Sequence, residues 1–228
     1  MKRIALVAGA TGLVGHQVVA RLLRDPAYTE VRVLTRRPFD LEDPHLTVVR
    51  TDFADLATLQ ALGDALAVSD VYCCLGTTIK RAGCRAAFAD VDERMVVDLA
   101  RATLDAGAQQ FLVISAVGAS DHALAFYSRV KGRMEKAVAA LGFDAVHVLR
   151  PSLLLGERDE HRAGEAFAQQ CAPLAERMLR GPLRRYRPVD ADEVAEGMLR
   201  VALRGERGVH VHHFPLDELV PEGEADSE

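Results

Sequence analysis

Short apolar segments alternate with longer amphipathic segments over the first two thirds of this 228-residue chain. The apolar segments expected to form strands are 3–8, 31–35, 46–50, 70–75, 110–116 and 144–150. The helical patterns between them cover 14–24, 56–66, 88–106 and 125–141. Strands that are apolar along their whole length are buried on both faces, and helices between successive strands make those strands parallel. The alternation therefore predicts an α/β fold with a doubly wound parallel sheet.

The pattern weakens after Pro151. A loop, helices near 165–180 and 191–204, and a short strand near 209–214 are expected next. No linker or repeat divides the chain, so we expect a single domain over 1–216, in which 151–216 packs onto the sheet and lines the substrate side. Residues 217–228 include six acidic and no basic residues, and we expect this tail to be flexible.

The net charge of the chain gives no indication of a nucleic-acid partner. The chain carries −5, and because the tail contributes six negative charges, the remaining residues carry +1. This balance gives little support for nucleic-acid binding, although the basic stretch 179–188 could contact a phosphate or form a solvated loop. No apolar run reaches the roughly 18 residues of a membrane span, and the N-terminal run is too short for a signal peptide. We expect a cytoplasmic protein that does not bind a membrane.

The sequence predicts no metal site. The four cysteines lack the spacing of zinc ligands. His212 and His213 lie together in a strand-like segment, but no second cluster of ligands is available to complete a site.

A glycine-rich turn follows the first strand directly, in the sequence GATGLVG. Gly9, Gly12 and Gly15 allow a tight turn and a close approach of the backbone to a pyrophosphate, and the following helix offers unpaired N–H groups. A simple turn between strand and helix is the alternative. The placement between the first strand and the first helix favours dinucleotide binding.

The end of the second strand favours one form of the cofactor. An acidic residue at this place would bind the ribose hydroxyl of NAD, but the chain has Arg36 and Arg37. Paired guanidinium groups suit a phosphate, so we expect NADP(H) to be preferred over NAD(H). Asp52 and Phe53, after the third strand, are placed to flank an adenine, although core packing is an equal alternative for Phe53.

A tyrosine and a lysine lie four residues apart in AFYSRVKG, as Tyr127 and Lys131. On a helix this spacing puts both side chains on one face. The chain has only 4 lysines among its 28 basic residues, which makes this lysine notable, although a solvated helix face would also fit. Ser115 ends the fifth strand, at the sheet edge where ligands bind in open α/β sheets. We therefore expect Ser115, Tyr127 and Lys131 to converge.

At these residues the sequence resembles the short-chain dehydrogenase/reductase superfamily, whose fold is of the Rossmann type. The resemblance covers about residues 3–155 and includes the glycine loop, CLGTT, the serine with Tyr-x-x-x-Lys, and RPSLLLG. More narrowly, CCLGTT, FYSRVKG and LRPSLLLGERDEHRAGE resemble the atypical, NADP(H)-binding branch related to the Tat-interacting oxidoreductase-like proteins, and extend the similarity to about residue 165. Beyond that point we expect the match to be poor.

The resemblance implies roles for these residues. Tyr127 is the expected general acid, Lys131 lowers its pKa and binds the nicotinamide ribose, and Ser115 holds the substrate oxygen. The cofactor-binding residues that it implies, with those already named, are Gly9, Thr11, Gly12, Leu13, Val14, Gly15, Arg36, Arg37, Asp52, Phe53, Leu75, Gly76, Thr77, Tyr127, Lys131, Pro151, Ser152 and Leu153. One departure is Asp92, which stands near the place where an asparagine often completes the proton relay of the superfamily.

The predicted function is reduction of a small-molecule carbonyl by an NADP(H)-dependent oxidoreductase. Charged residues after the fourth and sixth strands could bind an anionic or polar substrate, or could pair with one another: Lys80, Arg81, Glu157, Arg158, His161, Arg162 and Glu165. An NADPH-binding redox sensor or partner-binding protein with little turnover is an alternative. A sugar-nucleotide epimerase or dehydratase is a second, for which the chain is short. A monomer and a homodimer both fit the sequence.

Overall fold

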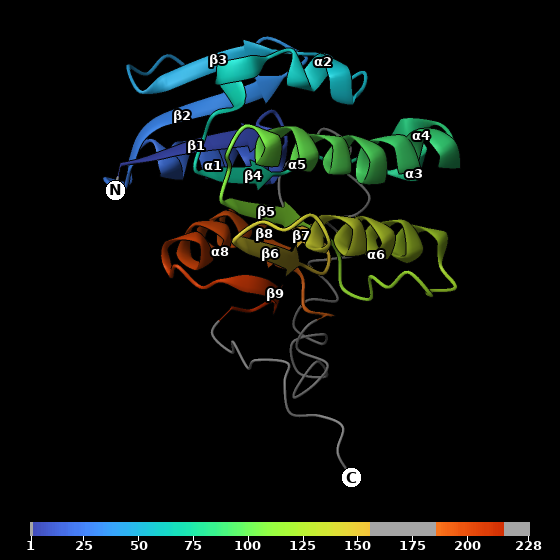
Figure 1. The fold of residues 1–228 in the computed structure, drawn as a ribbon. Coiled ribbons are helices and arrows are strands. Elements are labelled where there is room, and N and C mark those ends of the chain that lie inside the picture. The colour runs from blue at the N-terminus through green and yellow to red at the C-terminus, as the bar shows by residue number, and fades with distance from the viewer. Residues whose placement is uncertain (1, 156–185, 217–228) are drawn as a thin grey trace.

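The computed structural model of the chain describes residues 2–155 and 186–216 (Figure 1). The helix expected near 165–180, most of the basic stretch 179–188 and the acidic tail lie outside these residues. What is described forms one α/β domain around a single large sheet. The predicted fold class is confirmed.

Seven parallel strands form the sheet, in the order β3-β2-β1-β4-β5-β6-β9. Their bounds are Arg3–Ala8 for β1, Tyr28–Thr35 for β2, Leu46–Arg50 for β3, Asp70–Cys73 for β4, Gln110–Ile114 for β5, Ala145–Arg150 for β6 and Gly208–His213 for β9. All six predicted strands are present. The order reverses at β1 and β4, which places a crevice at the carboxyl ends of these two strands.

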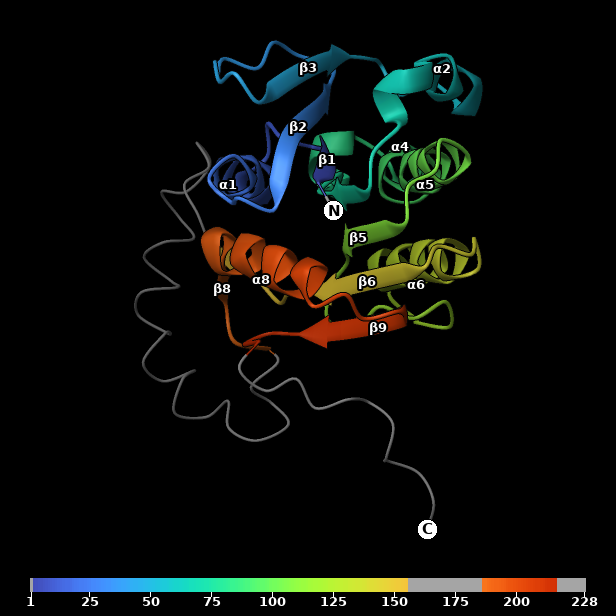
Figure 2. The ribbon, with the colours of Figure 1, turned by 60° about the vertical axis from the view of Figure 1, so that its left-hand side comes forward.

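Helices cover both faces of the sheet (Figure 2). One face carries α1 (Leu13–Leu22) and α8 (Ala191–Leu203), whose apolar side chains share one core with the strands. The other face carries α2 (Leu56–Gln60), α5 (Met95–Asp105) and α6 (Phe126–Ala139), around a second core. Each helix buries its apolar stripe, and the nearly unbroken apolar strands separate the two cores.

Two of the predicted helices are interrupted. The pattern over 88–106 forms α4 (Arg85–Ala89), a π-helical turn at Asp90–Arg94, and α5, so that one continuous helix is wrong in detail. The pattern over 56–66 forms α2 and a separate 3-10 turn at Gly63–Leu66. Gly63 has a φ of 51°, which is unfavourable for other residues and ends the regular helix.

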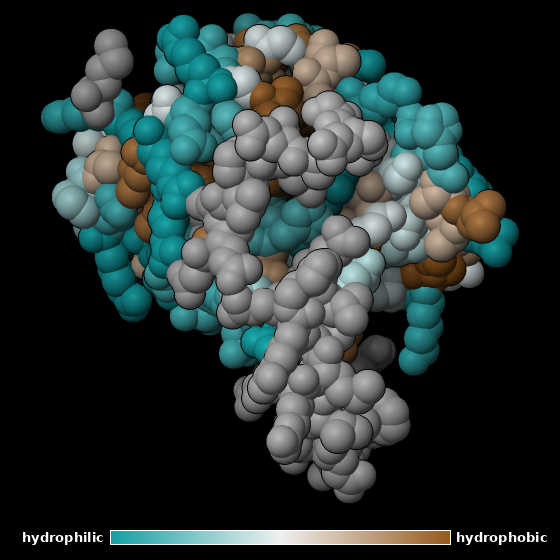
Figure 3. Space-filling view, turned by 90° about the horizontal axis from the view of Figure 1, so that it is seen from below, coloured by the Kyte–Doolittle hydropathy of each residue, from teal (hydrophilic) through white to brown (hydrophobic). Residues whose placement is uncertain are grey.

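The C-terminal part of the chain extends the sheet as well as packing onto it. The strand expected near 209–214 is β9, which pairs with β6 at the edge of the main sheet. A small second sheet joins β7 (Leu154–Leu155) to β8 (Val189–Asp190). Seen from the β9 side, most of the described surface is hydrophilic, with hydrophobic side chains in small separate groups (Figure 3).

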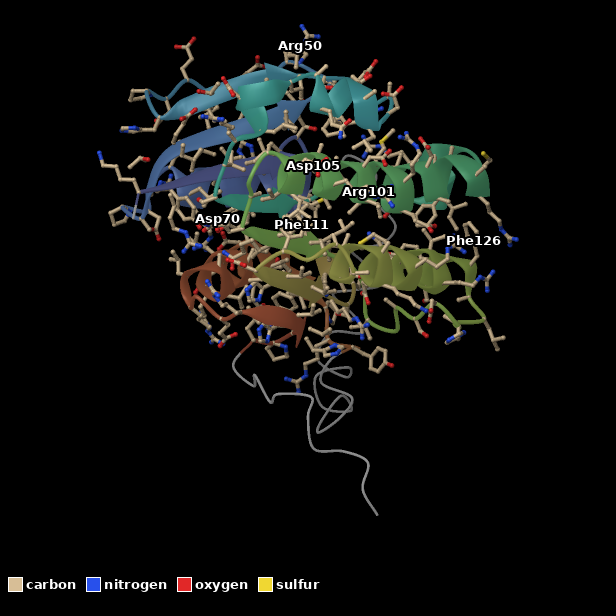
Figure 4. The ribbon with its side chains drawn as sticks, viewed as in Figure 1. Arg50, Asp70, Arg101, Asp105, Phe111 and Phe126 are labelled. Atoms are coloured by element: carbon tan, nitrogen blue, oxygen red, sulfur yellow. The ribbon has the colours of Figure 1, made fainter. Side chains whose placement is uncertain are left out.

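The two ends of the strands differ in the chemistry they present. Asp70 begins β4 and lies at the amino ends, whereas Phe126 begins α6 and lies at the far side, beyond the carboxyl ends (Figure 4). The short helix α3 (Ile79–Ala82) follows β4. The segments that contain the predicted site residues all leave the carboxyl ends of the strands.

Candidate active site

The glycine loop packs so closely that side chains cannot be added at two of its positions. Gly9 has a φ of 84°, and a Cβ there would lie 2.4 Å from the carbonyl oxygen of Cys74. A Cβ on Gly15 would lie 2.3 Å from the carbonyl oxygen of Gly9, which also accepts the Gly12 N–H at 2.9 Å. Only glycine is tolerated at positions 9 and 15, because the atoms that a Cβ would meet belong to the backbone and cannot move aside.

The first turn of α1 is open to an anion. Gly12 caps the helix, and within the described residues no side chain caps it and its first turn has no acidic residue. The first N–H groups of a helix have no acceptor within the helix, and the dipole there favours a negative charge. The backbone of Leu13, Val14 and Gly15 can therefore hold a pyrophosphate. This close-packed cradle fits a dinucleotide.

The end of β2 brings an arginine to this loop. The Arg37 guanidinium donates from Nη2 to Thr11 Oγ1 at 3.2 Å. Thr35 fixes the turn, because its hydroxyl donates to the Arg37 carbonyl at 2.9 Å. Arg36 is exposed beside it. One guanidinium group, that of Arg37, therefore lies against the glycine loop.

The predicted adenine contacts occupy different environments. Asp52 is exposed, and one of its carboxylate oxygens accepts the N–H of Ala54 at 2.9 Å. Phe53 is buried within the core beneath α2 and α5, with a φ of 56°. A non-glycine residue in this conformation costs about 1–3 kcal/mol, which the buried ring offsets. The Phe53 ring performs core packing, and its contact with an adenine remains a prediction.

The segment after β4 lies against the predicted catalytic residues. A Cβ on Gly76 would lie 3.4 Å from Asp92 Oδ1 and 4.0 Å from Lys131 Nζ, and Leu75 precedes it as a half-buried residue. The N–H of Thr77 donates to Asp92 Oδ2 at 2.8 Å. This contact joins the segment to the π-helical turn.

Ser115 lies just beyond β5, with an unsatisfied hydroxyl. Its N–H donates to the carbonyl oxygen of Leu149 at 2.7 Å, which extends the pairing of β5 with β6. The Ser115 Oγ is buried and has no hydrogen-bond partner within residues 2–155 and 186–216. Buried hydroxyl groups are normally satisfied, so this one is suited to a polar atom of a ligand.

Tyr127 and Lys131 lie one turn apart on α6, but in different surroundings. The Tyr127 side chain is 38% exposed, and its ring lies against that of Phe88, with centroids 5.4 Å apart. Lys131 is buried, and its ammonium donates to Asp92 Oδ1 at 2.8 Å and to the carbonyl oxygen of Ile114 at 3.2 Å. The solvated helix face is therefore wrong for Lys131.

The charge of Asp92 governs the titration of this lysine. Burial lowers the pKa of Lys131, but the neighbouring carboxylate raises it, and the net pKa lies above the ordinary value. Burial also raises the pKa of the nearby Cys73 thiol to about 12, so that the thiol is neutral. Lys131 is consequently an ammonium at neutral pH, as its predicted role requires.

The remaining predicted cofactor residues lie at the same edge. The carbonyl oxygen of Pro151 accepts the N–H of Val117 at 3.1 Å, which links the segments after β6 and β5. Ser152 donates to the carbonyl oxygen of Arg187, and Leu153 is exposed. Of the charged substrate candidates, Lys80 and Arg81 are exposed on α3, and those from 157 to 165 lie outside the described residues.

The partner of Lys131 differs from the expectation based on the sequence. In the sequence Asp92 stands only near the relay position, whereas in the structure it forms a buried ion pair with the lysine. A signal for this was an acidic residue among the apolar residues of FADVDERMVV, on a helix expected to pack on the sheet. Within the described ranges no group of three potential ligands could hold a metal, and no helix is long and apolar enough to cross a membrane.

Comparison with known proteins identifies the family. A model of the NAD(P)H-binding family matches residues 9–171. This chain belongs to that family, among the atypical short-chain dehydrogenases/reductases. The family and the cradle around Gly9 and Gly15 together support a nicotinamide cofactor. The predicted resemblance is confirmed.

Two relatives show how far the similarity extends. Protein FMP52, mitochondrial, of Candida albicans is 32% identical over 206 residues, which is 89% of each chain. Protein HTATIP2 of Rattus norvegicus is 32% identical over 165 residues, covering 72% of this chain and 68% of that protein. The alignment with the Candida protein extends beyond residue 165, whereas the alignment with the rat protein covers a smaller share of the chain.

Solved structures share the fold. The enzyme WbmH of Bordetella bronchiseptica, in complex with NAD+, superposes with a TM-score of 0.68 at 18% identity, covering 95% of this chain and 77% of that one. UDP-glucose 4-epimerase of Thermotoga maritima gives a TM-score of 0.68 at 18% identity, with 92% and 76% covered. At this identity the likeness concerns the fold alone.

Proposed function

We propose that this protein is an NADP(H)-dependent oxidoreductase that reduces a carbonyl group. The observation that carries the proposal is the arrangement at the end of β5. A buried, charged Lys131 lies one turn beyond a partly exposed Tyr127, and the Ser115 hydroxyl, which has no partner among the described residues, lies just beyond β5. These are the groups needed to bind a carbonyl oxygen and protonate it.

Each residue has one task in the reaction. Tyr127 gives its phenolic proton to the carbonyl oxygen, and Ser115 donates a hydrogen bond to the same oxygen as its negative charge develops. The Lys131 ammonium stabilises the phenolate that remains. NADPH, when bound, supplies the hydride that reduces the carbonyl carbon.

The lysine retains one donor for the cofactor. An ammonium group has three N–H donors, and those of Lys131 are directed in part to Asp92 and Ile114. The third donor is available for the ribose hydroxyl groups of the nicotinamide nucleoside. The glycine loop and the first turn of α1 hold the pyrophosphate.

The preference for NADP(H) is supported by the arginines that follow β2. Arg37 already contacts Thr11 of the glycine loop, and Arg36 is exposed beside it.

Titration with NADPH and NADH, followed by fluorescence, tests this preference. Arg37→Ala should weaken NADPH binding about tenfold or more, the value of one charge-assisted hydrogen bond, and should leave NADH binding unchanged. Arg50→Ala, at the exposed end of β3, is the matched control. Equal affinities for the two cofactors in the wild type would contradict the preference.

The chemistry is tested with a panel of carbonyl compounds, by measuring NADPH consumption. Tyr127→Phe removes one oxygen atom and should abolish turnover while cofactor affinity remains close to that of the wild type. A variant as active as the wild type would overturn the role of Tyr127. No consumption by a folded wild type that binds NADPH would favour the alternative, a redox-sensing or partner-binding protein.

The second alternative is a sugar-nucleotide epimerase or dehydratase. UDP-glucose 4-epimerase of Thermotoga maritima and a dTDP-glucose 4,6-dehydratase of Streptomyces venezuelae share this fold, and this chain covers 76% of the length of the epimerase. Conversion of a sugar nucleotide without net consumption of NADPH would support this alternative over carbonyl reduction.

The partners and location follow from the same proposal. We expect a small, polar or anionic carbonyl substrate, no binding to nucleic acid or membrane, and a monomer or homodimer. The location proposed for this chain is the cytoplasm, whereas the relative from Candida albicans is called mitochondrial. Light scattering of the purified protein tests its oligomeric state. Fluorescence imaging of the tagged protein tests its location.

A further inference from the structure

The π-helical turn at Asp90–Arg94 places one carboxylate inside the site and anchors its neighbours outside. Arg94 binds Asp90 and, from Nη1, Asp98 at 3.0 Å. Arg133 of α6 binds Glu93, with Nε 2.9 Å from Oε1. Asp92 points the other way and is 1% exposed. A π-helical turn inserts one extra residue into a helix and commonly occurs at functional sites.

Both carboxylate oxygens of Asp92 accept a hydrogen bond, and the two donors come from different parts of the fold. Oδ1 accepts from the Lys131 ammonium at 2.8 Å, and Oδ2 accepts from the backbone N–H of Thr77 at 2.8 Å. An asparagine could not replace it, because its amide offers one acceptor oxygen and would direct an NH2 group at the other donor. The two donors therefore require a carboxylate at this place.

Asp92 also supplies the charge that balances the buried lysine. The titratable groups that face Lys131 are Asp92 from the π-helical turn, Cys73 from β4 and Tyr127 from α6 itself. The Cys73 thiol is uncharged at neutral pH, because burial raises its pKa to about 12. Within the described part of the chain, Asp92 is thus the counter-charge of the Lys131 ammonium.

We propose that Asp92 is a positioning residue that keeps Lys131 protonated in its buried place and ties it to the segment after β4. The consequence for catalysis rests on the function proposed above, in which Lys131 holds the ribose and stabilises the phenolate. Asp92 performs neither step and acts through the lysine. Asp92 stands near the position at which the wider superfamily often has an asparagine, but its role is different, because it balances the charge of Lys131.

The lysine titration tests this directly, because the chain has only four lysines. NMR of protein with isotope-labelled lysine side chains should give four titrating signals, and Lys131→Arg identifies the one from Lys131. In the wild type this signal should titrate above the usual lysine pKa of about 10.4. In Asp92→Asn the pKa should fall by about 2 units or more, because a buried ammonium without a counter-charge favours the neutral amine.

A matched control separates this effect from a general loss of charge. Asp98→Asn removes a carboxylate on α5 that is also buried but pairs with Arg94. This variant should leave the Lys131 titration unchanged. If Asp92→Asn does not fold, the wild-type titration still decides, because a Lys131 pKa at or below the usual value overturns the proposal. An unchanged pKa in a folded Asp92→Asn variant also overturns it.

Cofactor affinity across a range of pH tests the link to function. In Asp92→Asn, NADPH affinity should decline about tenfold as pH rises through the lowered pKa of Lys131, whereas wild-type affinity should be constant there. A lowered lysine pKa without this decline would overturn the link to the cofactor. If the wild type itself does not bind NADPH, the proposed function fails, and the lysine titration still decides the role of Asp92.

Discussion

Two polar networks in this protein each contain a buried carboxylate paired with a basic residue. They differ in whether the other polar groups around that pair have hydrogen-bond partners. The first begins at Asp70, which accepts from Arg3 at 2.7 Å, from the Ser69 hydroxyl at 3.1 Å and from the Gln110 amide at 2.8 Å. The second joins Lys131 to Asp92 at the carboxyl ends of the strands. The first lies at the opposite end of β4 and continues toward β9.

The hydrogen bonds of the first network run in one direction. Gln110 donates to Asp70, so its carbonyl oxygen must accept from His147 Nε2, which is 3.1 Å away. His147 Nδ1 then accepts from His212 Nε2 at 3.0 Å. His147 is therefore neutral, and burial keeps His212 neutral at pH 7 by lowering its pKa to about 4. Among the described atoms of this network, His212 Nδ1 at its end has no hydrogen-bond partner. The network is almost completely satisfied by the protein itself.

The site at the carboxyl ends is satisfied only in its inner part. Lys131 and Asp92 pair with each other, but the Ser115 hydroxyl lacks a partner among the described residues and Tyr127 is partly exposed. Polar groups that pair among themselves stabilise the fold, whereas polar groups left open can bind a ligand. Mutations in the first network should therefore change stability, and mutations of the open groups at the second, Ser115 and Tyr127, should change activity.

The largest expected effect is on stability, from Asp70→Ala. This variant leaves the half-buried Arg3 guanidinium without its carboxylate and one N–H of the buried Gln110 amide without an acceptor, which costs about 3 kcal/mol of the free energy of unfolding. Urea denaturation measures the change. NADPH affinity of the folded fraction should remain at the wild-type value, and a loss of affinity at wild-type stability would invalidate the division between the two networks.

Ser115→Ala should strongly reduce activity and leave stability almost unchanged. Loss of a hydrogen bond to the developing oxyanion should reduce kcat about 10²–10³-fold on any carbonyl substrate found. The free energy of unfolding should change by no more than about 0.5 kcal/mol, because the hydroxyl has no partner within the described chain. Steady-state kinetics and urea denaturation of the same preparation measure both. A marked destabilisation would show that the hydroxyl is satisfied within the protein.

The buried histidines should make the fold sensitive to acid. Burial lowers the pKa of His147 to about 3 and that of His212 to about 4, from an ordinary value of 6.5. The unfolded chain then binds more protons below pH 6.5, so stability is complete above that pH and declines as pH falls toward 4 and then 3. Urea denaturation across this range should show a loss on the order of 1–3 kcal/mol for each of the two histidines between pH 6.5 and 4.

Substitution of one histidine tests that explanation. His212→Gln keeps a donor for His147 and removes one of the two titrating groups, so the loss of stability between pH 6.5 and 4 should be roughly halved. His45→Gln, at an exposed position, should leave the pH dependence as it is in the wild type. An unchanged slope in His212→Gln would show that other groups control acid unfolding.

The smallest effect should come from the surface pair Arg21–Asp192. It joins α1 to α8 with a distance of 2.7 Å, but the Asp192 side chain is 59% exposed. Solvent screening reduces such pairs to about 0–1 kcal/mol, so Asp192→Ala should lower the free energy of unfolding by no more than that. Urea denaturation with and without added salt measures it. A larger loss would mean that this contact is part of a more extensive network.

The sequence predicted the sheet and the site for related reasons. Apolar strands and intervening helices determine a parallel sheet, and a parallel sheet brings the residues after each strand to one edge. Ser115 and the helix of Tyr127 and Lys131 were thus placed at one edge without knowledge of their contacts. The glycine loop was equally local, because its chemistry depends on consecutive residues.

Features that depend on distant contacts were not predictable in the same way. A π-helical turn adds one residue and changes the apolar pattern over 88–106 little, so the pattern concealed the interruption. The pairing of Lys131 with Asp92 joins residues far apart in the sequence, and charge alone does not indicate which acidic residue is buried. The position of β9 beside β6 likewise depends on long-range pairing that the local sequence does not encode.

The packing of α1 against α8 has a consequence for synthesis of the protein in the cell. Val18 and Val19 of the first helix share one core with Val194 and Met198 of the last. A ribosome adds about 5–20 residues per second, so α1 emerges roughly ten seconds or more before the helix that covers it. During this interval the apolar face of α1 is exposed to solvent and to other nascent chains. We therefore expect the newborn chain to depend on chaperones until its last third has been translated.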